Sequence, residues 1–203
     1  MINVPATQNT EVIKAYEPDS KTMLGFWVYI MTDCVLFASL FAVYAVLHKN
    51  TFGGPSGRDL FSPSYVLVET LILLTSSFTC GLAMLAAARG ARKSVLTWFG
   101  ATFLLGFSFL VMEVTEFSKL VRDGDSWHRS GFLSSYFTLV GTHGLHITIG
   151  LLWIAVLMTK ISRGNMDANM IRKMTLLSLF WHFLDIIWIF IFTIVYMLGV
   201  IGV

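Results

Sequence analysis

The sequence predicts an all-α protein that crosses a membrane five times as one helix bundle. Of its 203 residues, 56% are hydrophobic and only 13% are charged, which lies outside the usual composition of soluble domains. The apolar residues also come in long runs rather than in the stripes of an amphipathic helix. Runs long enough for the roughly 20 residues that span hydrocarbon lie at residues 23–48, 65–88, 95–120, 131–161 and 171–199.

Residues 1–22 are predicted to form a tail in front of the first span. This tail lacks the basic start, apolar core and cleavage site of a signal peptide, so the span at 23–48 is expected to stay in the membrane. A loop containing GGPSG (residues 53–57) precedes the second span, 65–88, and its glycines and proline are typical of a tight turn. Pro63 follows this loop at a position where proline can begin a helix.

The last three predicted spans exceed the minimum length, so we expect them to tilt or to extend beyond the lipid. Arg163-Gly164-Asn165 marks a turn between the final two spans. The short connections leave no room for a second domain, and residues 23–203 are predicted to form a single transmembrane domain. Small residues allow helices to approach closely in lipid, and the third and fourth spans contain Gly100, Gly106, Gly141, Gly144 and Gly150.

Lysine and arginine residues predict the orientation of the bundle. The side that would hold the N-terminus carries nine of them: Lys14, Lys21, Arg89, Arg92, Lys93, Lys160, Arg163, Arg172 and Lys173. The opposite side carries five: Lys49, Arg58, Lys119, Arg122 and Arg129. Because cytoplasmic loops are enriched in these residues, we expect a cytoplasmic N-terminus and a periplasmic C-terminus. The net charge of +2, without a dense basic cluster, does not indicate a nucleic-acid partner.

Eight ionisable side chains lie inside the predicted spans: Asp33, Glu69, Glu113, Glu116, His143, His146, His182 and Asp185. A charged group near the bilayer centre costs about 2.5–3.5 kcal/mol, so such groups must be neutralised or paired within the bundle. Six of the eight form pairs three residues apart, a spacing that places both members on one face of a helix. Asp33 and Glu69 stand alone in the first two spans.

These side chains allow three interpretations. If the three paired faces converged, they would supply the carboxylate and imidazole ligands that helix bundles use to bind metals. The pairs fall at different depths in their spans, however, which favours several separate hydrogen-bonded contacts over one metal centre. A proton or ion route is the third interpretation. His143 and His146 cannot both ligate one haem iron, because they lie within a single helical turn.

Three segments in the last three spans carry a resemblance to a known family: VMEVTEF (residues 111–117), GTHGLHITIG (residues 141–150) and FWHFLDIIW (residues 180–188). In combination they resemble subunit III of the haem–copper terminal oxidases. Glu116 matches the recurring glutamate of that family. The resemblance extends from about residue 25 to residue 202 and so covers nearly the whole chain.

Within this family, the presence of five spans rather than seven makes the chain most similar to the bacterial cytochrome o ubiquinol oxidases. GFW (residues 25–27), MTDC (residues 31–34) and GGPSGRD (residues 53–59) carry the same likeness. The resemblance implies a complex of the aerobic respiratory chain in the cell inner membrane, which oxidises ubiquinol, reduces dioxygen to water and pumps protons. It also implies that haems, copper and ubiquinol bind to subunit I, and that subunits II and IV belong to the same complex.

The family resemblance implies a non-catalytic accessory role for this chain, which would carry no cofactor and would support assembly, stability and phospholipid packing around subunit I. Asp33 stands where other members carry a glutamate near their proton-uptake side, and its shorter side chain argues against a direct role in proton collection. The alternative is a self-contained membrane metalloprotein or ion carrier that uses the buried Glu, His and Asp pairs. That alternative predicts metal binding or ion transport by the isolated chain.

Overall fold

The computed structural model describes residues 20–53, 63–164 and 167–201 as helices joined by turns. Five helices are long and apolar enough to cross a membrane. They are α2 (Ser20–Leu47), α4 (Pro63–Ala88), α5 (Arg92–Arg122), α6 (Gly131–Arg163) and α7 (Ala168–Ile191). A π-helical turn, η1 (Phe192–Met197), and the short helix α8 (Leu198–Ile201) continue α7.

The helices confirm the predicted all-α class and the five predicted spans, with ends that differ by a few residues. The first helix begins at Ser20 and the second at Pro63, so both start before the apolar run itself. Parts of three predicted features lie outside the described residues: most of the N-terminal tail, the loop from residue 54 onwards, and Asn165 of the last predicted turn.

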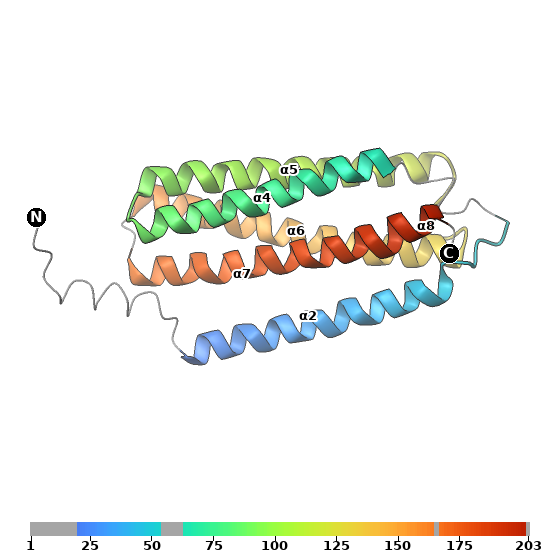
Figure 1. Ribbon diagram of the computed structural model, residues 1–203, viewed down its shortest axis with the longest axis horizontal. Helices are drawn as coiled ribbons and strands as arrows, with labels where there is room; N and C mark the ends of the chain where they lie inside the picture. Colours follow the sequence, from blue (N-terminus) through green and yellow to red (C-terminus); the bar gives the residue numbers. More distant parts are fainter. Residues whose placement is uncertain (1–19, 54–62, 165–166, 202–203) are drawn as a thin grey trace, which may run out of the picture.

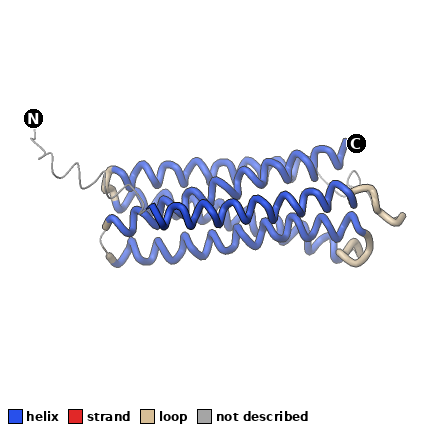
Figure 2. Tube along the Cα trace, turned by 90° about the horizontal axis from the view of Figure 1, so that it is seen from below, coloured by secondary structure: helices blue, strands red, loops and turns tan. Residues whose placement is uncertain are grey.

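The helices lie side by side along the long axis of the molecule and alternate in direction (Figures 1 and 2). Helix α4 packs against α5 and α7, and α6 packs against α5 and α7 as well, so these four helices form a closed ring. Helix α2 covers the ring mainly through α6. Only 22% of the most apolar stretch of α2 is buried, against 50% for the last span, so α2 exposes most of its surface to its surroundings.

Backbone caps rather than apolar runs define several helix ends. Gly90 has a positive φ of 67°, and the N–H groups of Gly90 and Ala91 donate back to carbonyls of the last turn of α4, as in a Schellman motif. Gly124, with φ of 87°, ends α5 in the same way. At the helix starts, the side chain of Ser130 caps α6 and that of Asp167 caps α7, each satisfying a free N–H group of the first turn.

The Trp181 ring lies in a slot between two glycines of neighbouring helices. A Cβ atom at Gly106 of α5 would lie 2.8 Å from the ring, and one at Gly150 of α6 would lie 2.9 Å from it. Cβ atoms at Gly100 and Gly141 would meet only ordinary contacts, at 3.7 and 3.5 Å. Only some of the predicted glycines therefore allow close packing between helices. At Gly106 and Gly150 the space is filled by the Trp181 side chain rather than by the backbone of a neighbouring helix.

Candidate functional site

The eight predicted ionisable side chains lie at helix contacts in three groups. The first comprises Glu69 of α4 with Glu113 and Glu116 of α5, and the second comprises Asp33 of α2 with His143 and His146 of α6. The third comprises His182 and Asp185 of α7, which face Ser77 of α4.

Asp33 and His146 form a pair that joins α2 to the ring of four helices. The Nε2 atom of His146 lies 3.7 Å from Oδ2 of Asp33, and both side chains are nearly buried. The Nδ1 atom of His146 lies 2.7 Å from the carbonyl oxygen of Thr142, and it must be the donor because a carbonyl only accepts. The distance between Nε2 and Oδ2 is too long for a hydrogen bond, and Oδ2 of Asp33 has no hydrogen-bond partner among the residues described. The contact nevertheless places a carboxyl beside an imidazole, which is the kind of pairing that ionisable groups inside a membrane span require.

His143 occupies a different environment from His146, although the two share one helix face in the predicted pair. Its side chain is completely buried. The imidazole stacks on Trp188 with ring centroids 5.3 Å apart, and Phe109 meets it edge-on at 6.0 Å. Neither ring nitrogen has a hydrogen-bond partner in the part of the chain that the structure describes. The rings therefore cover His143 without satisfying its polar edge.

The three glutamates gather where α4 and α5 meet. Glu69 is fully buried and interacts electrostatically with Glu113 and Glu116. Neither carboxyl oxygen of Glu69, nor Oε2 of Glu113, has a hydrogen-bond partner among the residues described. Glu116 differs, because its Oε2 accepts a hydrogen bond of 3.3 Å from Tyr196, whose hydroxyl also lies 2.9 Å from that of Tyr136. The predicted Glu113 and Glu116 pair thus contains one unsatisfied and one satisfied member.

His182 and Asp185 are bridged by a hydroxyl of the neighbouring helix. The Ser77 Oγ atom lies 2.5 Å from Nδ1 of His182, and the same side chain hydrogen-bonds Asp185. Together they open on a surface groove of about 600 Å³ between α4 and α7. The apolar walls of this groove include Leu74, Phe78, Leu82 and Leu85. This group therefore combines polar side chains with an apolar surface.

Sequence reasoning did not single out the hydroxyl groups that satisfy the buried tryptophans. The Trp181 Nε1 atom donates to Ser76 Oγ at 3.1 Å, and Trp188 Nε1 donates to Thr70 Oγ1 at 3.0 Å. Both hydroxyls belong to α4, so they tie α4 to α7 in the middle of the bundle. Ser and Thr inside a predicted span are a signal for such interhelical bonds, and the second span contains several.

The described imidazoles are packed or bonded within the helix bundle. Across the described ranges, no three His, Cys, Asp or Glu side chains lie together as a metal ion would require. Nδ1 of His146 is bound to its own helix and Nδ1 of His182 to Ser77. Aromatic rings pack around the imidazole of His143. The arrangement instead supports contacts between helices.

Comparison with known proteins identifies the family of this chain. The family model described as cytochrome c oxidase subunit III matches residues 14–200. The chain is 57% identical to the cytochrome bo(3) ubiquinol oxidase subunit 3 of Pseudomonas aeruginosa, across 91% of this chain and 88% of the relative. It is 53% identical to the protein of the same name from Pseudomonas putida, across 91% and 89%. The cytochrome c oxidase subunit 3 of Bacillus sp. (strain PS3) is 44% identical across 88% and 86%. The chain therefore belongs to the cytochrome c oxidase subunit III family, whose members are non-catalytic third subunits of haem–copper oxidases.

Proposed function

We propose that this chain is the accessory subunit III of a proton-pumping ubiquinol oxidase in the bacterial inner membrane. The observation that carries the proposal is the identity of 57% and 53% to two relatives named cytochrome bo(3) ubiquinol oxidase subunit 3. In this proposal haems, copper and ubiquinol belong to subunit I, and subunits II and IV complete the complex. The polar contacts between α2, α4, α6 and α7 fit a chain that supports assembly and stability.

The proposed orientation has the N-terminus in the cytoplasm and the C-terminus in the periplasm. The end of α4, the start of α5, the end of α6 and the start of α7 lie at the end of the bundle where α2 begins (Figure 1). Arg89 lies in the turn between α4 and α5, Lys93 in the first turn of α5 and Arg163 at the end of α6, and the Arg92 side chain donates to the Ser162 carbonyl. An excess of Lys and Arg on this side supports a cytoplasmic location.

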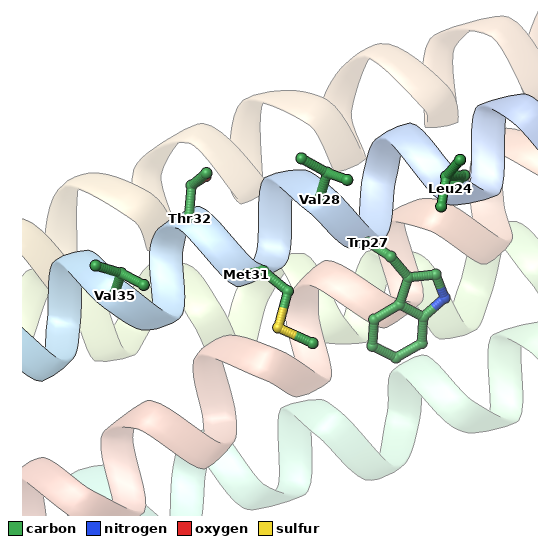
Figure 3. A pocket seen from close by; sticks show the side chains of 6 residues that line it. All are labelled: Leu24, Trp27, Val28, Met31, Thr32 and Val35. Atoms are coloured by element: carbon green, nitrogen blue, oxygen red, sulfur yellow. The ribbon is translucent and has the colours of Figure 1, made fainter.

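The outward face of α2 is the surface that we assign to contact with other components of the membrane. Six residues of α2 from Leu24 to Val35 line a shallow hollow of about 550 Å³ (Figure 3). Thr32 is the only polar residue among these six, and Leu24 and Val35 are 66% and 70% exposed. An apolar surface of this kind suits an apolar face of a catalytic subunit or phospholipid chains.

Purification of the tagged chain from its native membrane in mild detergent tests the proposal. We expect a large haem-bearing subunit to co-purify, with the visible spectrum of a haem protein and with ubiquinol oxidase activity. Recovery of the chain alone, colourless and in good yield, would contradict the proposal. Metal analysis and ion transport in liposomes would then test the alternative of a self-contained metalloprotein or ion carrier.

The accessory role makes a second prediction at the contact between α2 and α6. Replacing His146 by Phe removes the imidazole beside the Asp33 carboxyl and leaves Tyr29 as its neighbouring polar side chain, which destabilises the assembly by about 1–3 kcal/mol. Turnover per assembled complex should change little. Thr159→Val is a matched control, because this α6 hydroxyl bonds only its own helix at an exposed position. A fully assembled His146→Phe complex that lost most of its turnover would show that the accessory assignment is wrong.

A further inference from the structure

The surface groove between α4 and α7 holds polar side chains halfway along the membrane spans. Six residues of α4 line it, from Leu74 to Leu85, together with His182 and Asp185 of α7. His182 is residue 15 of the 30 in the span that begins at Ala168. Ser77 is residue 15 of the 26 in α4. The polar group therefore lies near the centre of both spans, although the groove around it is apolar and open to the outside.

The hydrogen bonds of this group leave one ring nitrogen without a partner. The Ser77 Oγ atom lies 2.5 Å from Nδ1 of His182 and also bonds the Asp185 carboxyl. A serine hydroxyl has a single proton, so it donates to one of these groups and accepts from the other. Nε2 of His182 has no hydrogen bond to the described residues, and it is not among their fully buried polar atoms. This nitrogen is therefore open to a partner outside the chain.

Phospholipid does not satisfy a nitrogen at this depth. Acyl chains neither donate nor accept hydrogen bonds, and the headgroups lie beyond the hydrocarbon core, whose boundaries are about 15 Å from its centre. Ionisable side chains inside membrane spans almost always face the interior of a bundle or pair with another polar group. The partner of Nε2 must therefore come from another molecule that reaches the centre of the membrane.

The shape of the groove fits a helix. Its six α4 residues follow one another at positions i, i+3, i+4, i+7, i+8 and i+11, which makes one continuous stripe about 16 Å long. Within this stripe Ser77 and Gly81 are small residues four positions apart, a spacing that lets transmembrane helices approach closely. A Cβ atom at Gly81 would meet nothing within 4 Å, so the space beside it is open to a neighbouring helix.

We propose that the groove between α4 and α7 binds a transmembrane helix of another oxidase subunit. That helix places a hydroxyl or amide side chain opposite Nε2 of His182, because these groups can either donate or accept a hydrogen bond and carry no charge into the membrane. The inference rests on the proposed function, since it requires an oxidase complex. It gives that complex a second contact surface, separate from the outward face of α2.

A larger side chain at Gly81 tests the groove and leaves its polar group intact. Because a Cβ atom there meets no neighbour, Gly81→Leu fills the groove without crowding the first atoms around it. We expect the ratio of released to retained chain, at a fixed detergent concentration, to rise about fivefold or more, and Gly81→Ala to raise it less. A groove that faces only lipid would gain helix propensity from leucine. An unchanged or lower ratio for Gly81→Leu would therefore overturn the inference.

Photo-crosslinking of the purified complex identifies the occupant. A benzophenone amino acid replaces Phe78, which is 66% exposed in the groove, or the control residue Leu104 of α5, which is 67% exposed elsewhere. We expect only the Phe78 position to join a transmembrane segment of another subunit with a hydroxyl or amide side chain near its middle.

Other products at the Phe78 position would contradict the inference. A lipid or quinone adduct, a second copy of this chain, the same segment at both positions, or no cross-link would each overturn it. If the complex still contains its haem-bearing subunit, the proposed function stands without the inference. A chain that purifies without any haem-bearing subunit would overturn both.

Discussion

The slot that holds Trp181 allows a prediction whose size follows from the structure. In Gly106→Ala the new methyl group would lie 2.8 Å from two carbon atoms of the indole ring and 3.1 Å from Leu151. Carbon atoms prefer separations of about 3.5–4.0 Å, so the ring would have to move by about 0.7 Å or more. It cannot move away easily, because its Nε1 atom donates to Ser76 and its other contacts include Gly150.

Overpacking of this kind costs about 1–3 kcal/mol, while replacing glycine by alanine in a helix gains about 0.8–1 kcal/mol. We therefore expect Gly106→Ala to lower the free energy of unfolding by up to about 2 kcal/mol. Gly100→Ala is the matched control on the same helix, because its methyl group would meet only Met158, at 3.7 Å. The control should gain stability from helix propensity alone.

Thermal unfolding of the purified complex, followed by dissociation of this chain, measures both variants. One kcal/mol corresponds to a midpoint shift of about 2–4 °C for a chain of this size, so the two variants should differ measurably and in opposite directions. In a Trp181→Phe background, the penalty of Gly106→Ala should shrink because the smaller ring leaves space for the methyl group. Equal stability of the Gly106→Ala and Gly100→Ala variants would contradict the tight packing of Trp181 against Gly106.

Three further outcomes follow from individual contacts and are measured by the same unfolding assay. Trp188→Phe should lower the free energy of unfolding by about 0.5–1.5 kcal/mol, because it removes the hydrogen bond from Trp188 to Thr70. Thr70→Val should lower it little further in the Trp188→Phe background. Ser130→Ala should lose about 1 kcal/mol with the α6 cap, and an unchanged midpoint would contradict the capping role. Asp33→Asn should lower the free energy of unfolding less than Asp33→Leu, since an amide N–H can donate to Nε2 of His146. Equal decreases for the two variants would argue against the contact between Asp33 and His146.

The sequence predicted the helices well because the length of an apolar run is a direct measure of a span. It predicted their ends less well, since ends depend on caps. Helix α7 begins at Ala168, three residues before the predicted start at Ile171, because Asp167 caps it. Helix α5 likewise continues past Leu120 to Arg122, where Gly124 ends it through its positive φ.

The candidate site was predictable as a set of residues but not as a set of contacts. Spacing placed His143 and His146 on one helix face, yet a separation of about 60° around the helix axis was enough to give them different neighbours. His146 faces Asp33 of α2, whereas His143 stacks on Trp188 of α7. The sequence has no signal for which helices are neighbours, and the partner of each polar group depends on that arrangement.

The π-helical turn η1 separates the geometry of the last residues from that of α7. A π turn bonds each residue to the fifth along rather than the fourth, so it accommodates one residue more than an α turn. Trp188 and Tyr196 are eight residues apart, which on an unbroken α-helix would turn Tyr196 about 80° away from the face of Trp188. Because η1 takes up one residue in its wider turn, both rings stay on one face, with centroids 6.1 Å apart. The extra residue therefore acts as an angular correction, which lets Tyr196 bond Glu116 on the same side of the helix on which Trp188 stacks on His143.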